Sequence, residues 1–242
     1  MRVAVLSDVH GNLHALEAVL QAVDAAGVDE VWCLGDVVGY AARPNECCEL
    51  VRARTSVCLA GNHDLVIVGT LGLEEFSHDA AIAAGWAQEH LREENRAYLA
   101  GLPSQTERAG TLLAHASPRD PVWEYVLSED VALAALASTE APLVLVGHSH
   151  IALALGLAEG RLAGGLAPAG TEVDLAAARW LLNPGSVGQP RDGDPRAAWL
   201  LLDLGARRAT FARVDYDVAA TQAEIREAGL PELLAMRLES GS

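Results

Sequence analysis

The chain has 242 residues, of which 51% are hydrophobic, which is enough for one sizeable α/β core and short of what two full domains usually need. Its 33 acidic and 17 basic residues give a formal net charge of −16, and every basic residue is an arginine. Such a surface repels nucleic-acid polymers and anionic membranes, so we expect one domain over residues 1–242 that binds neither.

The first apolar run, residues 3–6, stops abruptly at Asp8 and His10. Alternate residues at a strand end point the same way, so this carboxylate and this imidazole can reach one cation above the edge of a sheet. Apolar residues at helical spacing follow in residues 13–23, and Gly27 is placed to end that helix. The segment therefore predicts a strand, a ligand-bearing loop and a helix.

The same pattern, an apolar run that ends in polar residues, recurs four times. The later polar clusters are Gly35-Asp36, Gly61-Asn62-His63-Asp64, His115 and Gly147-His148-Ser149-His150. Crossovers of equal length join the first three clusters, and such β-α-β crossovers are almost always right-handed. We therefore expect one edge of a parallel sheet to collect every ligand.

Residues 64–100 show an alanine-rich helical pattern with a predicted N-cap at Ser77. We expect this segment to form a helical cover beside the site. Residues 105–114 are expected to form an edge strand followed by a central one, and Ser128 is expected to cap another helix.

Beyond His150, short runs separated by glycines predict antiparallel strands that form a second sheet. The runs are residues 152–157, 161–166, 179–182, 197–204 and 209–214. Residues 217–240 are expected to form C-terminal helices. Together these elements predict an α/β fold, a four-layer α-β-β-α sandwich of two packed sheets flanked by helices.

The polar clusters supply eight side chains suited to metal chemistry. They are Asp8, His10, Asp36, Asn62, His63, His115, His148 and His150. Mixed oxygen and imidazole ligands suit Mn, Fe, Zn or Ni better than Ca or Mg. This set is too large for one tetrahedral ion, and it suits two ions about 3.5–4 Å apart that share a carboxylate. Two such cations would attract a small phosphorylated substrate into an otherwise acidic protein.

In order and approximate spacing, the five motifs from Asp8-x-His10 to Gly147-His148-x-His150 resemble those of the calcineurin-like metallophosphoesterases. The resemblance covers residues 1–213, and within the family the chain is most similar to the small bacterial phosphoesterases related to the YfcE group. It implies a phosphoester hydrolase with two divalent metal ions, and Mn is the ion we expect to be preferred in vitro.

The resemblance also implies a role for each motif residue. Asp8, His10 and His150 would bind the first ion, Asn62, His115 and His148 would bind the second, and Asp36 would bridge them. His63 would donate to the leaving-group oxygen or stabilise charge on phosphorus, with Asp64 orienting it, while a metal-bound hydroxide attacks phosphorus. Asn12 would support the first metal site from behind.

One departure from the family concerns substrate binding. Protein phosphatases of this superfamily carry Asp-Arg after the Gly-Asp motif, whereas Val37-Val38-Gly39-Tyr40 follows Asp36 here. The absence of that phosphate-binding arginine argues against phosphoprotein substrates. Arg191 is the first candidate to replace it, followed by Arg43 and Arg119, and the alternative is that each is a solvent-facing charge.

The remaining histidines and two aromatic residues have ordinary structural interpretations. His14, His78 and His90 lie in helical patterns and are expected to be surface or half-buried histidines. Trp123 and Tyr125 either stack on a nucleobase at a pocket rim or pack against the sandwich, which is the commoner arrangement.

No targeting segment is visible, and no apolar run approaches the roughly 20 residues of a membrane span, so a cytoplasmic location is expected. The expected activity is hydrolysis of small phosphodiesters or phosphomonoesters, including nucleotides or cyclic nucleotides. One alternative is a phosphoprotein phosphatase. The other is a non-catalytic scaffold that keeps the fold and binds a protein partner, although such a scaffold would be expected to lose His63 or the bridging Asp36. The oligomeric state stays open.

Overall fold

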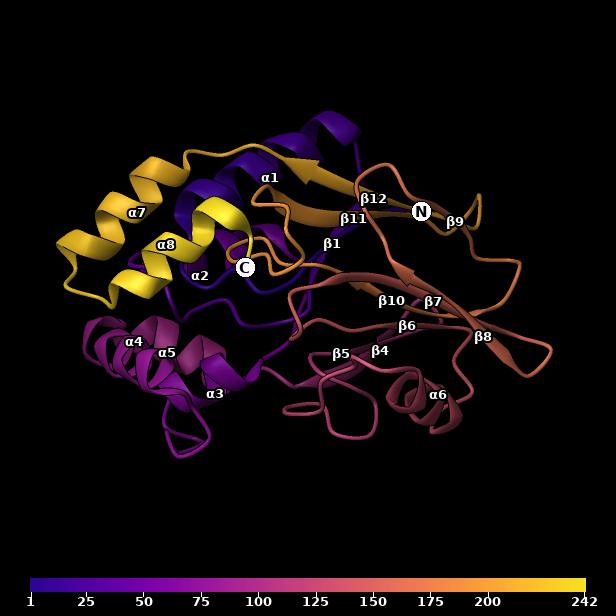
Figure 1. Cartoon of the computed structure of the whole chain (residues 1–242), viewed down its shortest axis with the longest axis horizontal. Coiled ribbons are helices and arrows are strands. Elements are labelled where there is room, and N and C mark those ends of the chain that lie inside the picture. The colour runs from indigo at the N-terminus through magenta and orange to yellow at the C-terminus, as the bar shows by residue number, and fades with distance from the viewer.

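A computed structural model describes all residues, 1–242, and contains two six-stranded sheets with helices outside them (Figure 1). The first sheet has the order β3 (Val57–Cys58), β2 (Glu30–Cys33), β1 (Arg2–Leu6), β11 (Ala197–Asp203), β12 (Arg208–Val214) and β9 (Glu172–Asp174). The second has the order β4 (Gln105–Arg108), β5 (Thr111–Ala114), β6 (Leu143–Leu145), β10 (Arg179–Pro184), β7 (Ala152–Ala158) and β8 (Arg161–Leu166). The predicted four-layer sandwich is confirmed.

Strand β1 shows why the early strands are continuously apolar. Val3 and Val5 belong to the core between the two sheets, whereas Ala4 and Leu6 belong to the core under the outer helices. A strand that is buried on both faces reads as an uninterrupted apolar run. Because β1 pairs in parallel with β2, and β2 with β3, the three strands end at the same edge.

The outer layers are helical. The helices are α1 (Leu13–Ala26), α2 (Pro44–Arg54), α3 (Asn62–Ile67), α4 (His78–His90), α5 (Glu93–Ala100), α6 (Glu129–Ala137), α7 (Val218–Glu227) and α8 (Glu232–Ser240). Helices α1 and α2 cover the outer face of the first sheet, and α6 covers that of the second (Figure 1). None of these helices is long and apolar enough to cross a membrane.

The predicted helix ends are largely present. Asn12 caps α1 by accepting a hydrogen bond from the Ala15 backbone nitrogen at 3.1 Å, and Gly27 ends α1 with φ of 63°. The Ser128 side chain caps α6. Ser77 stands at the N-cap of α4 but makes no side-chain capping bond.

The helical cover consists of α3, α4 and α5, and α8 packs against α4 in a separate apolar cluster.

The strands after His150 do not form a sheet of their own, so that prediction was wrong. Strands β11, β12 and β9 extend the first sheet, because β11 pairs antiparallel with β1. Strands β10, β7 and β8 extend the second sheet, because β10 pairs in parallel with β6. Alternating hydrophobicity shows which face of a strand is buried, but it does not name the neighbouring strand.

Candidate metal centre

Every candidate ligand follows a parallel strand. Asp8 and His10 follow β1, Asp36 follows β2, Asn62 and His63 follow β3, His115 follows β5, and His148 and His150 follow β6. The first three strands belong to one sheet and the last two to the other. The ligands therefore come from the edges of two sheets, and the expectation that a single sheet edge collects all of them was wrong.

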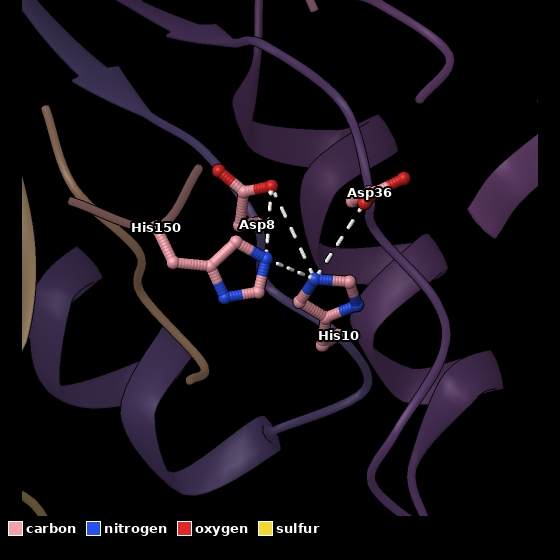
Figure 2. Close-up of side chains that lie close together, drawn as sticks. All are labelled: Asp8, His10, Asp36 and His150. Carbon is pink, nitrogen blue, oxygen red and sulfur yellow. Dashed lines mark hydrogen bonds and ion pairs between the residues drawn. The ribbon is translucent and has the colours of Figure 1, made fainter. Parts of the chain in front are cut away.

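Asp8, His10, Asp36 and His150 converge in a first cluster, and all four are buried (Figure 2). The Oδ1 atom of Asp8 lies 3.5 Å from His150 Nε2 and 4.0 Å from His10 Nε2. The Oδ2 atom of Asp36 lies 3.6 Å from His10 Nε2. Four atoms that commonly bind metals thus surround one small volume.

Backbone carbonyls set the protonation of the two histidines in this cluster. His10 Nδ1 lies 3.3 Å from the Val38 carbonyl oxygen, and His150 Nδ1 lies 2.6 Å from that of Gln189. A ring nitrogen that donates to a carbonyl carries the proton, so Nε2 of each ring has a lone pair. The two Nε2 atoms lie only 3.0 Å apart, and a cation that accepts both lone pairs would remove their repulsion.

A second cluster contains Asp36, His115 and His148, with Asn62 beside it. His115 Nε2 lies 3.5 Å from Asp36 Oδ2 and 3.2 Å from Asn62 Oδ1. The Nδ1 atom of His115 lies 2.9 Å from the Leu34 carbonyl oxygen, which again leaves Nε2 with the lone pair. The second donor set therefore has two imidazoles, like the first, but one carboxylate instead of two, with an amide oxygen in addition.

Asp36 is the residue that the two clusters share. Its Oδ1 atom accepts a hydrogen bond from the His63 backbone nitrogen at 2.9 Å. Its Oδ2 atom is buried and has no hydrogen-bond partner, and the same is true of Nε2 of His148. Buried polar atoms without a partner are rare and costly. The residues present therefore fit two cations bridged by the Asp36 carboxylate.

Burial shifts Asp8, Asp36, His10, His148 and His150 towards their neutral forms. It raises the pKa of Asp8 to about 7, and together with the nearby Asp64 charge it raises the pKa of Asp36. Burial lowers the pKa of His148 to about 2 and also lowers the pKa of His10. Neutral imidazole is the form that binds metals, whereas the Arg191 charge offsets only part of the effect of burial on the two acidic side chains.

Five of the candidate ligands adopt the left-handed backbone conformation. They are Asp8 (φ 55°), His10 (φ 51°), Asp36 (φ 53°), His148 (φ 63°) and His150 (φ 61°). Few residues other than glycine adopt this conformation, and such residues concentrate at functional sites, where the surrounding structure holds them. The ligand side chains are thus positioned by the fold itself.

His63 lies beside the first cluster, with its ring centroid 4.7 Å from that of His10 and its Nδ1 atom unpartnered. Asp64 does not orient it, so that expectation was wrong. The Asp64 carboxylate instead accepts hydrogen bonds from the backbone nitrogens of Gly61 at 3.0 Å and Val38 at 3.1 Å. It therefore caps α3 and fixes the loop after β2.

A cavity of about 710 Å³ opens beside the clusters. Its lining residues are Tyr40, Asn62, His63, Glu75, Phe76, Ser77, Ala80, Trp123, Tyr125, Arg191 and Arg237. The Tyr125 ring stacks on the His148 ring with centroids 3.9 Å apart. Trp123 both lines the cavity and packs against the core of the first sheet, so the packing is present, while stacking on a nucleobase stays a prediction.

Of the three candidate substrate-binding arginines, Arg191 alone lines the cavity. Arg43 donates to the Glu224 carboxylate at 2.7 Å, and Arg119 lies 3.4 Å from the Glu124 carboxylate. These partners hold both side chains on the surface outside the cavity, so the structure gives no support to the predicted substrate contacts of Arg43 and Arg119.

Tyr40 and Arg237 are among the cavity residues that sequence reasoning missed. The Tyr40 ring centroid lies 4.5 Å from those of His10 and His63. Its place in the loop directly after Asp36 was a signal, because that loop begins at the ligand edge. Arg237 is on α8, and no local motif marks it.

Asn12 does not touch a candidate ligand side chain. Its Nδ2 atom donates to the Gly188 carbonyl oxygen at 2.9 Å, and the Gly188 backbone nitrogen donates to the Asp8 carbonyl oxygen at 2.9 Å. Asn12 therefore reaches the site only through the backbone behind Asp8. His78 and His90 are exposed, and His14 is half-buried beside Glu224.

Residues 1–206 match the calcineurin-like phosphoesterase superfamily domain. The chain belongs to this superfamily. The predicted family is thereby confirmed, and such phosphoesterases depend on a dinuclear metal centre. The match ends before β12, α7 and α8.

Relatives cover the whole chain. An uncharacterized protein of Methanocaldococcus jannaschii is 37% identical over 244 residues, which are 99% of this chain and 98% of that protein. The crystal structure of a metallophosphoesterase from Sphaerobacter thermophilus has a TM-score of 0.91 and 43% identity, and covers 100% of this chain and 99% of its own. A symmetrical bis(5′-nucleosyl)-tetraphosphatase of Actinobacillus pleuropneumoniae is 31% identical over 140 residues, 55% of this chain and 50% of that enzyme.

Proposed function

We propose that the protein hydrolyses small phosphoesters with the help of two divalent metal ions. The first ion would be held by Asp8, His10 and His150, the second by Asn62, His115 and His148, and Asp36 would bridge the two. The observation that carries the proposal is the pair of buried clusters sharing Asp36, whose Oδ2 atom has no partner within the protein.

Bound at these clusters, divalent ions would polarise phosphoryl oxygens and lower the pKa of a coordinated water. His63 lines the cavity, and burial followed by the Arg191 charge lowers its pKa, so its ring is neutral at pH 7. A neutral imidazole still carries one ring proton and can donate it in a hydrogen bond to a leaving-group oxygen. Arg191, which lines the cavity, would bind phosphate oxygens of the substrate.

Small phosphorylated molecules, nucleotides among them, fit this cavity best. Its volume of about 710 Å³ lies within the range of small-molecule pockets, roughly 300–1,000 Å³. Phe76, Trp123 and Tyr125 provide aromatic surface for a nucleobase. The similarity to a bis(5′-nucleosyl)-tetraphosphatase supports a substrate of this kind, whether a phosphodiester, a phosphomonoester or a phosphoanhydride.

The proposal is tested by metal analysis and hydrolysis assays on the wild type and on Asp36→Asn. With manganese, the wild type should bind two ions per chain and hydrolyse bis-p-nitrophenyl phosphate or p-nitrophenyl phosphate. Asp36→Asn should bind fewer ions and lose about 100-fold or more in kcat/KM. Asp215→Asn, at an exposed position after β12, is the matched control.

The same assays separate the alternatives. Two bound ions without hydrolysis of either ester or of a phosphopeptide would favour a non-catalytic scaffold. Hydrolysis of the phosphopeptide alone would favour a phosphoprotein phosphatase, which the absence of Asp-Arg from residues 37–40, after Asp36, argues against.

A further inference from the structure

Two arginines in the cavity converge on one neutral side chain. Arg191 donates from Nη2 to Gln189 Oε1 at 2.9 Å, and Nη1 of Arg237 lies 3.5 Å from the same oxygen. Neither guanidinium forms an ion pair, whereas ten of the other arginines do. The two positive charges therefore share an acceptor but have no counter-ion.

The same three side chains leave buried donors unused. The Nε atoms of Arg191 and Arg237 and the Nε2 atom of Gln189 are buried without a hydrogen-bond partner, and Gln189 is only 1% exposed. Burial and, next, the charge of Arg191 lower the pKa of Arg237. Unpaired buried donors and neighbouring like charges both cost free energy, and an anion bound between them would relieve both.

This group of side chains lies next to the metal clusters, not inside them. Gln189 accepts from His150 Nδ1 through its backbone, so the loop that orients a candidate ligand also carries the group. The Arg191 guanidinium carbon lies 5.6 Å from the centroid of the Tyr40 ring, which in turn contacts the ring of His63. One aromatic ring thus connects the arginines with the clusters.

Arg237 comes from α8, which lies outside the residues that match the superfamily domain. Leu234 and Leu238 on α8 are buried and pack with Ala83 of α4, and this packing brings α8 to the cavity. Figure 1 shows α8 beside α7 at the end of the molecule that also carries α4 and α5. The C-terminal helix α8 therefore adds a second positive charge, that of Arg237, to the site formed by the superfamily domain.

We propose that Arg191, Arg237 and Gln189 form a subsite for a second phosphate group of the substrate, one that is not transferred. This inference rests on the proposed function, because it places the reacting phosphate at the metal clusters. Guanidinium groups present paired donors that match phosphate oxygens. The substrate class is then a small molecule with linked phosphates, such as a nucleoside diphosphate or a dinucleoside polyphosphate.

Calorimetric titration of the manganese-loaded protein tests the subsite. The two probes are the phosphonate analogue of AMP, in which a methylene group replaces the 5′ ester oxygen so that it cannot be hydrolysed, and adenosine 5′-(α,β-methylene)diphosphate, whose two linked phosphorus groups cannot be hydrolysed apart. Arg237→Gln should weaken binding of the second probe by about tenfold, the loss expected for a charge-assisted hydrogen bond, and binding of the AMP analogue by less than about twofold. Arg237→Lys keeps the charge and should recover most of the affinity.

Arg161→Gln, at an exposed position on β8, is the control for loss of one positive charge. Equal weakening of both probes by Arg237→Gln would place Arg237 at the reacting phosphate and overturn the subsite. Unchanged binding of the diphosphate analogue, or no binding of it by the wild type, would also overturn the inference. A selective loss in a protein that hydrolyses no phosphoester would support the subsite and reject the proposed function.

Discussion

Asp8→Asn should stabilise the metal-free protein and reduce its stabilisation by manganese. Asp8 is fully buried, and both of its carboxylate oxygens lie 3.2 Å from the backbone nitrogen of His148. Burial is the main cause that raises its pKa from the ordinary 3.8 to about 7, and the charge of Asp36 adds to it. Ionised Asp8 therefore costs free energy in the folded protein, and asparagine removes this cost while keeping the shape of the side chain.

The magnitude follows from the pKa. A rise from 3.8 to about 7 corresponds to about 4 kcal/mol, at about 1.4 kcal/mol for each tenfold change in proton affinity. Because the folded-state pKa is raised, the contribution of Asp8 to stability is fully present below pH 3.8 and is lost as the pH rises through about 7. Between about pH 5 and about pH 8, the free energy of unfolding of the wild type should fall by about 2–3 kcal/mol relative to that of Asp8→Asn. Histidines such as His10 and His150, whose pKa burial lowers, act in the opposite direction but are common to both proteins.

The assay is urea unfolding of chelator-treated protein at both pH values, followed by tryptophan fluorescence, with Asp215→Asn as the control for loss of an exposed carboxylate. Manganese should then stabilise the wild type more than Asp8→Asn, because a ligand that binds only the folded state adds its binding free energy to stability. A difference in stability that does not change with pH would refute the reasoning about burial. Equal stabilisation by manganese would refute Asp8 as a ligand.

Two further substitutions test the geometry of the centre. Gly61→Ala would place a Cβ atom 2.1 Å from Asp36 Oδ1, so we expect fewer than two bound manganese ions by elemental analysis, and full occupancy would contradict the proposed bridge. The matched change Gly85→Ala, in α4 with open space around it, should leave metal binding intact and raise the free energy of unfolding by about 0.5–1 kcal/mol. His63→Asn should keep both ions and lower kcat by about 100-fold, whereas an unchanged kcat would exclude this imidazole from the reaction.

Local sequence was sufficient to predict the first part of the fold. Strands β1 and β2 are apolar on both faces and are joined by a capped helix, so their order and direction follow from nearby residues. The later strands β7, β8, β10, β11 and β12 could be located but not assigned to a sheet, and β9 was not predicted. The pairing of β11 with β1 joins opposite ends of the chain, and no alternation within β11 records that neighbour.

The same distinction holds for the site. Side chains such as Asp8 and His115 were predicted to meet because each stands directly after an apolar strand, and the structure places both in the clusters. Whether an arginine reaches the cavity depends on distant partners. Arg43 is paired with Glu224 outside the cavity, whereas the packing of α8 places Arg237 in the cavity. Nothing in the local sequence distinguishes these two arginines.

The backbone at the candidate ligands helps to distinguish a metal centre from an inert scaffold. Asp8, His10 and Asp36 have φ between 51° and 55°, a conformation that costs other residues about 1–2 kcal/mol each and glycine very little. A protein that used only its outer surface to bind a partner would gain stability from glycine at these positions. Here each position instead carries a buried polar side chain, and the Asp36 Oδ2 atom has no partner in the protein. Cations that bind these side chains would offset both costs at once, which is why the strained residues favour a working centre over a scaffold.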